Sequence, residues 1–186
     1  IYASQGLDIA SISEHKHKNR EMKAVYCHDT VCSIVEHQAI SNQELLALDV
    51  DVLIPAALEN QITLANVQEI RAKYIFEVAN GPINYDADQI LTQQGTYVFP
   101  DILVNAGGVT VSYFEWVQNR HGWYWTLAEV NQRLQEKMQI EAEQVWQISQ
   151  DLKIDLRTAA YVQALKRLGE ALDAKGNRNY FVNSSL

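Results

Sequence analysis

The chain has 186 residues, of which 47% are hydrophobic and 20% are charged, so its composition is that of one globular domain and excludes a disordered chain. With 2 cysteines and 8 glycines, it is neither a disulfide framework nor collagen-like. Its 15 basic and 23 acidic side chains give a net charge of −8, which argues against nucleic-acid binding, and no apolar run approaches the roughly 18 residues that a membrane-spanning helix needs.

The first fifty residues contain three local signals of secondary structure. Apolar residues at helical spacing, with Asp8 as N-cap, predict a short helix around residues 8–17. The β-branched run at residues 31–35 indicates a strand. Ser41 and Glu44 have the spacing of a capping box, which predicts the start of another short helix.

Residues 50–99 alternate between strand and helix patterns. We expect strands at residues 50–54, 74–79 and 97–99, with helices at residues 63–72 and 85–94, the second of which ends at Gly95. This alternation is typical of βαβ units, whose connections are right-handed. The strands should therefore lie side by side, in chain order, in a parallel sheet.

The last third of the chain predicts two long helices. A capping box formed by Thr126 and Glu129 opens the first helix, and Asp155 precedes the second, which should end at Gly176 before a loose tail. Asp155 and Arg157 are expected to serve in capping and pairing at that helix start. The aromatic side chains between Tyr113 and Trp125 are expected to pack the helices, because the acidic charge argues against a nucleic-acid stacking platform.

Three segments follow the carboxyl ends of the expected strands, where open parallel sheets bind ligands. They are residues 55–61, 79–82 and 101–108, and they combine small residues with Asn and Gln, whose amides can serve carboxamide and ribose groups. Residues 105–112 also place amides and a hydroxyl at a helix start, where a carboxylate or phosphate can bind. Each segment alone is better explained as a turn or cap, but three at successive strand ends indicate a ligand site.

Four stretches carry a resemblance to a known family. They read VLIPAALENQIT at residues 52–63, EVANGP at 77–82, PDILVNAGGVTVSYFEW at 100–116 and DLRTAAYV at 155–162. Over residues 41–175 the chain resembles the nucleotide-binding domain of the glutamate/leucine/phenylalanine/valine dehydrogenase family, and its glutamate dehydrogenase branch most, whereas residues 20–38 match poorly. The resemblance implies an α/β fold with a Rossmann-like, doubly wound parallel sheet in the order 3-2-1-4-5-6 and C-terminal long helices. The first two strands and the glycine loop are missing, and strands three to six are kept.

The resemblance also implies roles for seven residues. The cofactor of the complete enzyme would be NAD or NADP, and the reaction would be oxidative deamination of an amino acid to a 2-oxo acid, glutamate to 2-oxoglutarate in the nearest branch. The expected cofactor-binding residues are Ala56, Ala57 and Gln61 on the adenosine and ribose side, Asn80 at the nicotinamide ribose and Asn105 at the nicotinamide carboxamide. The expected substrate-binding residues are Val109 at the substrate side chain and Ser112 at its carboxylate.

The resemblance assigns no catalytic residue. The family's glycine-rich turn, catalytic lysines and acid/base aspartate have no match in these residues and would precede Ile1. We therefore expect a fragment of a cytoplasmic enzyme that is inactive alone, with residues 1–125 a partial dinucleotide-binding domain and residues 126–186 a helical appendage packed on it. A sheet that lacks two strands has a bare edge, so we expect self-association or pairing with the missing portion.

Two alternatives stay open on the residues. The chain could be a non-catalytic remnant or partner subunit derived from that family. It could also be another nucleotide-binding enzyme on the same fold, which requires an accidental match at residues 105–116. Cys27, His28 and Cys32 could suggest a metal site, but a structural zinc site needs four ligands and no second pair follows, so we expect no metal and reduced thiols. His15 and His17 are expected on a solvated helix face.

Overall fold

The computed structural model describes residues 1–20, 23, 25–28, 31–34 and 38–175. The chain divides into two compact units, Ile1–Asp49 and Val50–Leu186. The boundary expected between residues 125 and 126 lies inside the second unit, and the separate appendage stays a prediction. No helix in the described ranges is both long enough and apolar enough to cross a membrane.

The first unit contains the two capped helices that the sequence predicts. Helix α1 (Ile9–Asn19) begins after Asp8, whose carboxylate accepts a hydrogen bond from the Ser11 amide at 3.1 Å. Helix α2 (Asn42–Leu46) begins with the reciprocal capping box: Ser41 accepts from the Glu44 amide, and the Glu44 carboxylate accepts from the Ser41 amide. These bonds satisfy amide groups that a helix start leaves without partners.

The two strands of the first unit form a sheet of their own. Strand β2 (Val31–Ile34) is confirmed, but it pairs antiparallel with β1 (Val25–His28) in a separate two-stranded sheet. Only two residues separate the strands, whereas a parallel pair needs a crossover of roughly a dozen residues or more. In the described ranges, this segment is therefore not a further strand of the parallel sheet.

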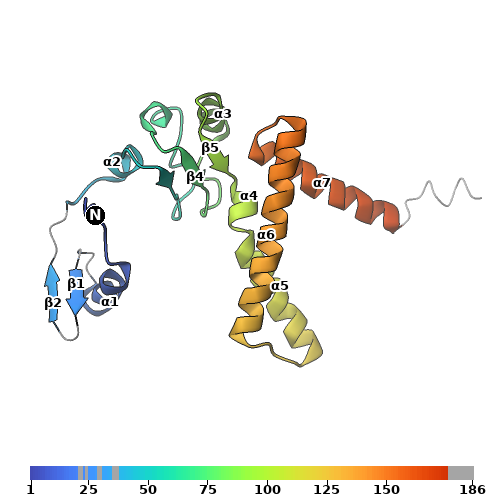
Figure 1. The fold of residues 1–186 in the computed structure, drawn as a ribbon, viewed down its shortest axis with the longest axis horizontal. Coiled ribbons are helices and arrows are strands. Elements are labelled where there is room, and N and C mark those ends of the chain that lie inside the picture. Colours follow the sequence, from blue (N-terminus) through green and yellow to red (C-terminus); the bar gives the residue numbers. More distant parts are fainter. Residues whose placement is uncertain (21–22, 24, 29–30, 35–37, 176–186) are drawn as a thin grey trace, which may run out of the picture. The chain divides into compact units, whose positions relative to one another are not determined.

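The second unit is built on the parallel sheet that the alternating pattern predicts. Strands β3 (Val52–Leu53), β4 (Tyr74–Phe76) and β5 (Tyr97–Phe99) are parallel and lie in the order β3-β4-β5 (Figure 1). The strands are shorter than expected. The α/β class and the Rossmann-like arrangement are confirmed.

One expected helix between the strands forms and the other does not. Helix α3 (Tyr85–Gln93) begins at Asn84 and is followed by Gly95, whose φ of +83° favours glycine. The prediction of a helix at residues 63–72 is wrong, since only a short 3-10 turn, η1 (Val67–Glu69), is present there. The Asn66 side chain accepts from the Thr63 amide and donates to the Gln61 carbonyl, and these local bonds compete with a helix.

Four helices follow the sheet. They are α4 (Asp101–Val104), α5 (Ala106–His121), α6 (Leu127–Leu152) and α7 (Leu156–Ala174). The expected capping box at Thr126 and the Asp155 N-cap are both present, whereas Gly176 and the tail lie outside the described residues. An apolar cluster joins α4, α6 and α7, with β5 against it, so the long helices and the sheet share one core. Its buried members are Leu103, Val145, Leu156, Ala159 and Ala160.

The aromatic segment only partly packs the helices. Phe114 and Trp125 meet edge to face at 5.6 Å, and the Arg133 guanidinium lies over the Trp125 ring at 4.3 Å, which joins α6 to the segment before it. In contrast, Trp116 and Trp123 are largely exposed. Packing within this unit therefore accounts for part of the aromatic segment.

Candidate functional site

Backbone hydrogen bonds bring the first two expected segments together at the carboxyl edge of the sheet. After β3, the Pro55 carbonyl accepts from the amides of Val78 and Ala79, which follow β4. Further on, the Gln61 amide donates to the Pro82 carbonyl at 2.8 Å. The loop after β3 therefore lies directly against the loop after β4, as the rule for ligand sites in open parallel sheets requires.

The third expected segment, residues 101–108, contacts the second through two asparagine side chains. Asn80 follows β4, and Asn105 lies where α4 ends and α5 begins. The Asn105 Nδ2 donates to Asn80 Oδ1 at 2.6 Å. Within the described residues, the other two polar side-chain atoms, Asn80 Nδ2 and Asn105 Oδ1, make no hydrogen bond in the structure. The two side chains thus leave one donor and one acceptor available to a ligand, and we call them the amide pair.

The residues expected on the adenosine side lie in the loop after β3. Ala56 and Ala57 are exposed, so a ligand can approach the backbone there without meeting a large side chain. Gln61 is half-buried, and its Nε2 donates to the Glu59 carbonyl at 2.8 Å. Their roles as cofactor ligands remain predictions.

The residues expected to bind substrate lie on α5. Val109 is 70% exposed in the first turns of the helix, so it is free to contact a ligand. Ser112 lies in the second turn, and its hydroxyl donates to the Gly108 carbonyl at 3.1 Å. A carboxylate could receive a hydrogen bond from Ser112 only after that bond is broken. The substrate roles of both residues remain predictions.

The helix start itself differs from the free N-terminus that the sequence suggests. Residues 101–104 form α4, so Asn105 is at once the C-cap of α4 and the N-cap of α5. The Gly108 amide donates to the Asn105 carbonyl at 3.2 Å. One of the early α5 amides is therefore already used, and anion binding at this start stays a prediction.

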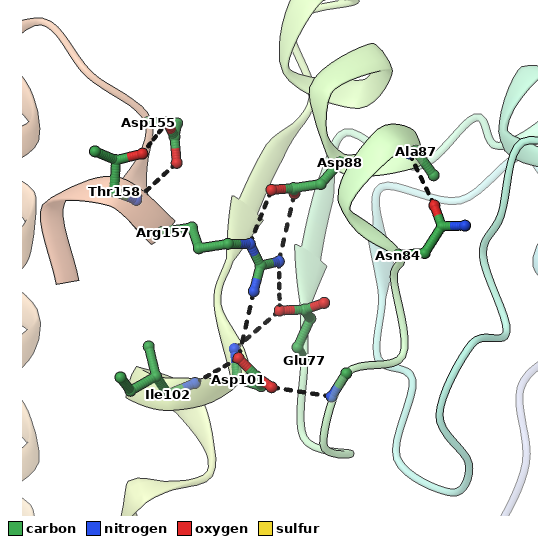
Figure 2. Close-up of polar contacts among 10 residues, drawn as sticks. Glu77, Asn84, Ala87, Asp88, Asp101, Ile102, Asp155, Arg157 and Thr158 are labelled. Atoms are coloured by element: carbon green, nitrogen blue, oxygen red, sulfur yellow. Dashed lines mark hydrogen bonds and ion pairs between the residues drawn. The ribbon is translucent and has the colours of Figure 1, made fainter. Parts of the chain in front are cut away.

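Figure 2 shows a cluster of four charged side chains that joins α7 to the segments around β4. Arg157 of α7 donates to Glu77 at 2.7 Å, to Asp88 at 2.8 Å and to Asp101 at 3.3 Å. The Glu77 side chain is fully buried and that of Asp88 is 3% exposed. One cation thus holds three carboxylates that come from the end of β4, from α3 and from the start of α4. We call these four residues the arginine cluster.

Burial governs the electrostatics of the arginine cluster. Burial raises the pKa of the Glu77 carboxyl above its ordinary value, and the charge of Arg157 opposes this only in part. The Glu77 Oε1 atom has no hydrogen-bond partner in the structure, which adds to the cost of its charge. For Arg157, burial lowers the pKa, but the bond to Asp88 and the charges of Glu77 and Asp88 outweigh burial, so its pKa is raised and it stays charged.

The sequence did indicate pairing for Arg157 but not its partners. Asp155 caps α7 as expected by accepting from the Thr158 amide at 2.8 Å. Arg157 instead reaches residues 56 to 80 positions away in the chain. One signal was available, because Glu77 continues the apolar strand pattern of residues 74–79 and a charged residue in a buried strand needs a partner.

The described residues contain no group of three or more His, Cys, Asp or Glu side chains arranged to hold a metal ion. The hairpin register sets Cys27 opposite Cys32 along the backbone. The expectation that these cysteines bind no metal remains a prediction.

The fold defines the chain as an open, parallel α/β protein of Rossmann-like architecture. The family model described as Glutamate/Leucine/Phenylalanine/Valine dehydrogenase matches residues 1–176. The chain belongs to this family.

Its relatives include glutamate dehydrogenases. It is 62% identical over 184 residues to the NADP-specific glutamate dehydrogenase of Synechocystis sp., covering 99% of this chain and 43% of the relative. The NAD-specific glutamate dehydrogenase of Staphylococcus aureus (strain COL) is 49% identical over 147 residues, 79% of this chain and 35% of the relative. The chain therefore spans less than half the length of these relatives.

Solved structures of glutamate dehydrogenases also match the fold of this chain. The hetero-hexameric glutamate dehydrogenase of Thermus thermophilus, in its Leu-bound form, matches with a TM-score of 0.82 and 28% identity over 95% of this chain and 39% of that one. The glutamate dehydrogenase of Peptoniphilus asaccharolyticus matches with a TM-score of 0.74 and 33% identity over 95% of this chain and 37% of that one.

Replacing Arg157 should destabilise the fold strongly. Arg157→Met keeps an apolar stem but leaves three carboxylates around a buried site without their cation, which should cost about 3–5 kcal/mol in the free energy of unfolding. Arg167→Met is the matched control, because the Arg167 side chain is 46% exposed and its pair with Glu141 is worth at most about 1 kcal/mol. Urea unfolding followed by circular dichroism measures both; equal losses would contradict the assigned weight of the cluster.

The raised pKa of Glu77 should make the free energy of unfolding depend on pH. Because the pKa of Glu77 is raised in the folded chain, the folded state binds the proton more tightly, so this contribution to stability is lost as pH rises from the ordinary value of 4.5 through the folded value. Glu77→Gln does not titrate. The free energy of unfolding of the variant, relative to the original chain, should therefore rise as the pH increases from 4.5 upward. A relative fall over that range, measured by urea unfolding, would show that pairing lowers the pKa instead.

Proposed function

We propose that this chain is part of the nucleotide-binding domain of a glutamate dehydrogenase, and that the complete enzyme uses NAD or NADP to deaminate glutamate oxidatively to 2-oxoglutarate. The identities to NADP- and NAD-specific glutamate dehydrogenases support the reaction. Because the chain spans 43% of the Synechocystis relative, the activity belongs to the complete enzyme. The observation that carries the proposal within this chain is the amide pair.

The amide pair fits the carboxamide of a nicotinamide ring. That group carries one NH₂ donor and one carbonyl acceptor, and the pair leaves the side-chain acceptor of Asn105 and the side-chain donor of Asn80 available to them. When bound, the cofactor supplies the hydride chemistry, and the chain's own residues fix the orientation of the ring. Fixing that orientation matters because a small displacement of a reacting group lowers the rate steeply.

The roles proposed for the other expected site residues follow from where these residues lie in the fold. Ala56, Ala57 and Gln61 would line the adenosine and ribose side, since they lie in the loop after β3 that packs against the Asn80 loop. On α5, Val109 would contact the substrate side chain and Ser112 would bind its carboxylate after releasing Gly108. These 186 residues hold no glycine fingerprint and none of the family's lysine motifs, so the chain by itself should show no turnover. We place the complete enzyme in the cytoplasm.

The unpaired edge of β3 supports the proposal that this chain binds another strand there. In the described ranges β3 pairs only with β4, and its Val52 side chain is 45% exposed, as is Ile54 at 55% just beyond it. An unpaired strand edge invites pairing with another strand. We therefore propose that the chain either associates with itself or pairs with further chain of the complete enzyme along this edge.

A charge on that edge should reduce association. For the isolated chain we expect dimers or larger species by light scattering, and Val52→Lys should shift them toward the monomer. Leu165→Lys, at an exposed position of α7, is the matched control and should leave the distribution unchanged if the edge alone mediates association. A monomeric original chain would contradict the proposal.

Removing one member of the amide pair should impair turnover in a complete enzyme. The test uses a fusion in which this chain replaces the matching 43% of the Synechocystis relative. The fusion should reduce NADP⁺ or NAD⁺ with glutamate, and Asn105→Ala should lower kcat/KM about tenfold, the loss expected for one or two hydrogen bonds.

Gln139→Ala is the matched control, because Gln139 is an exposed amide of α6 that bonds only Glu143 among the described residues. It should leave turnover unchanged. A folded fusion without activity would favour the non-catalytic remnant instead.

A further inference from the structure

The arginine cluster does more than hold α7 against the sheet. Its member Asp101 uses both carboxylate oxygens and its backbone amide, all toward different elements. Oδ1 accepts from Arg157 at 3.3 Å, Oδ2 accepts from the Gly81 amide at 2.9 Å, and the Asp101 amide donates to Glu77 at 2.9 Å (Figure 2). Asp101 is therefore fixed on three sides.

Asp101 reaches both members of the amide pair through the backbone. Gly81, whose amide Asp101 holds, directly follows Asn80 and has a φ of +52°, so the loop is held in a conformation that favours glycine. On the other side Asp101 opens α4, and its carbonyl accepts from the Asn105 amide at 3.0 Å. One residue thus sets the backbone of both asparagines.

The bond of 2.6 Å between the two asparagine side chains depends on this arrangement. Asn80 and Asn105 are both only partly covered, and they are 25 residues apart in the chain, so nothing local fixes their separation. The Asp101 carboxylate is oriented through Oδ1 by the Ile102 amide at 2.8 Å and by Arg157 at 3.3 Å, and the Arg157 guanidinium is itself held by Glu77 and Asp88. The forked geometry of arginine suits this role, which a point charge would fill poorly.

We propose that Asp101, oriented by Arg157, is the positioning residue of the amide pair. Its carboxylate holds the Asn80 loop and the Asn105 helix junction at the separation at which one donor and one acceptor face a ligand. The consequence for cofactor binding rests on the proposed function above, whereas the coupling of Asp101 to the pair does not. The alternative role for Asp101 is purely structural: it would stabilise the whole fold without specific effect on the site.

Hydrogen exchange on the 186-residue chain distinguishes the two roles. Asp101→Asn keeps the size, but its amide cannot accept from both Gly81 and Arg157 in the present arrangement. We expect exchange of the Gly81 amide to quicken at least about tenfold more than exchange of the buried Leu91 amide, with a shift of the Asn105 side-chain amide signals. Equal acceleration at Gly81 and Leu91 would leave only the structural role and overturn the proposal.

Two further variants keep this test decisive. Asp155→Ala removes a carboxylate cap two residues from Arg157 that makes no bond to the loop, so it should change both amides by the same factor. If Asp101→Asn does not fold, Arg157→Lys replaces it: the charge remains, the fork is lost, and the Gly81 amide should again respond more than Leu91. An unchanged ratio of the two exchange rates in Arg157→Lys would equally overturn the proposal.

A double-mutant cycle in the fusion tests the consequence for turnover. Asp101→Asn alone should lower kcat/KM by up to about tenfold, whereas in the Asn105→Ala background it should lower kcat/KM less than about threefold, because the pair it positions is already gone. Additive effects would overturn the positioning role. If the unmodified fusion is inactive, the proposed function fails, and the exchange measurement still decides the coupling of Asp101 to the pair.

Discussion

The second unit depends on one largely buried cation, whose side chain is 19% exposed. Arg157 comes from the start of α7, yet it bonds carboxylates from β4, α3 and α4 that are 56 to 80 positions away in the chain. Three acidic groups at such close quarters, one of them fully buried, would repel each other and pay a large desolvation cost without it. An apolar cluster could hold the helix against the sheet, but it could not accept the Gly81 amide or orient α4.

The contacts of Arg157 are linked by hydrogen bonds to the carboxyl edge of the sheet. The loops after β3 and β4 are joined by backbone hydrogen bonds, and the start of α4 is joined to the β4 loop through Asp101. Asn80 and Asn105 meet at this junction. The polar network and the site are thus one continuous set of hydrogen bonds. Glu77 and Asp88 are buried, Arg157 and Asp101 are partly exposed, and the neutral amides remain accessible.

The sequence predicts best what residues within four positions of each other decide. Asp8, Ser41, Thr126 and Asp155 cap their helices as expected, because a cap bonds an amide three residues on. The alternation of strand and helix patterns likewise predicted a parallel sheet with its strands in chain order. Local preference misled at residues 63–72, where Asn66 bonds the backbone and only a 3-10 turn forms.

Contacts between residues far apart in the chain could be identified only from the three-dimensional structure. The partners of Arg157 and the meeting of Asn80 with Asn105 join residues 25 or more positions apart, and no spacing in the chain encodes such pairs. Residues 31–34 have a strand pattern that suits a parallel or an antiparallel partner equally, so the pattern could not exclude the hairpin with residues 25–28. Asn80 and the residues of the loop after β3 lie at the carboxyl edge of the sheet, which spacing alone could only suggest, whereas Val109 and Ser112 lie on α5.

The most direct test of the account is a crystal structure of the fusion with NADP⁺ or NAD⁺ bound. The account predicts that the nicotinamide carboxamide lies about 3 Å from Asn105 Oδ1 and Asn80 Nδ2, with Asp101 still bonded to the Gly81 amide and to Arg157. A nicotinamide ring bound elsewhere, with the amide pair unchanged and facing solvent, would contradict it.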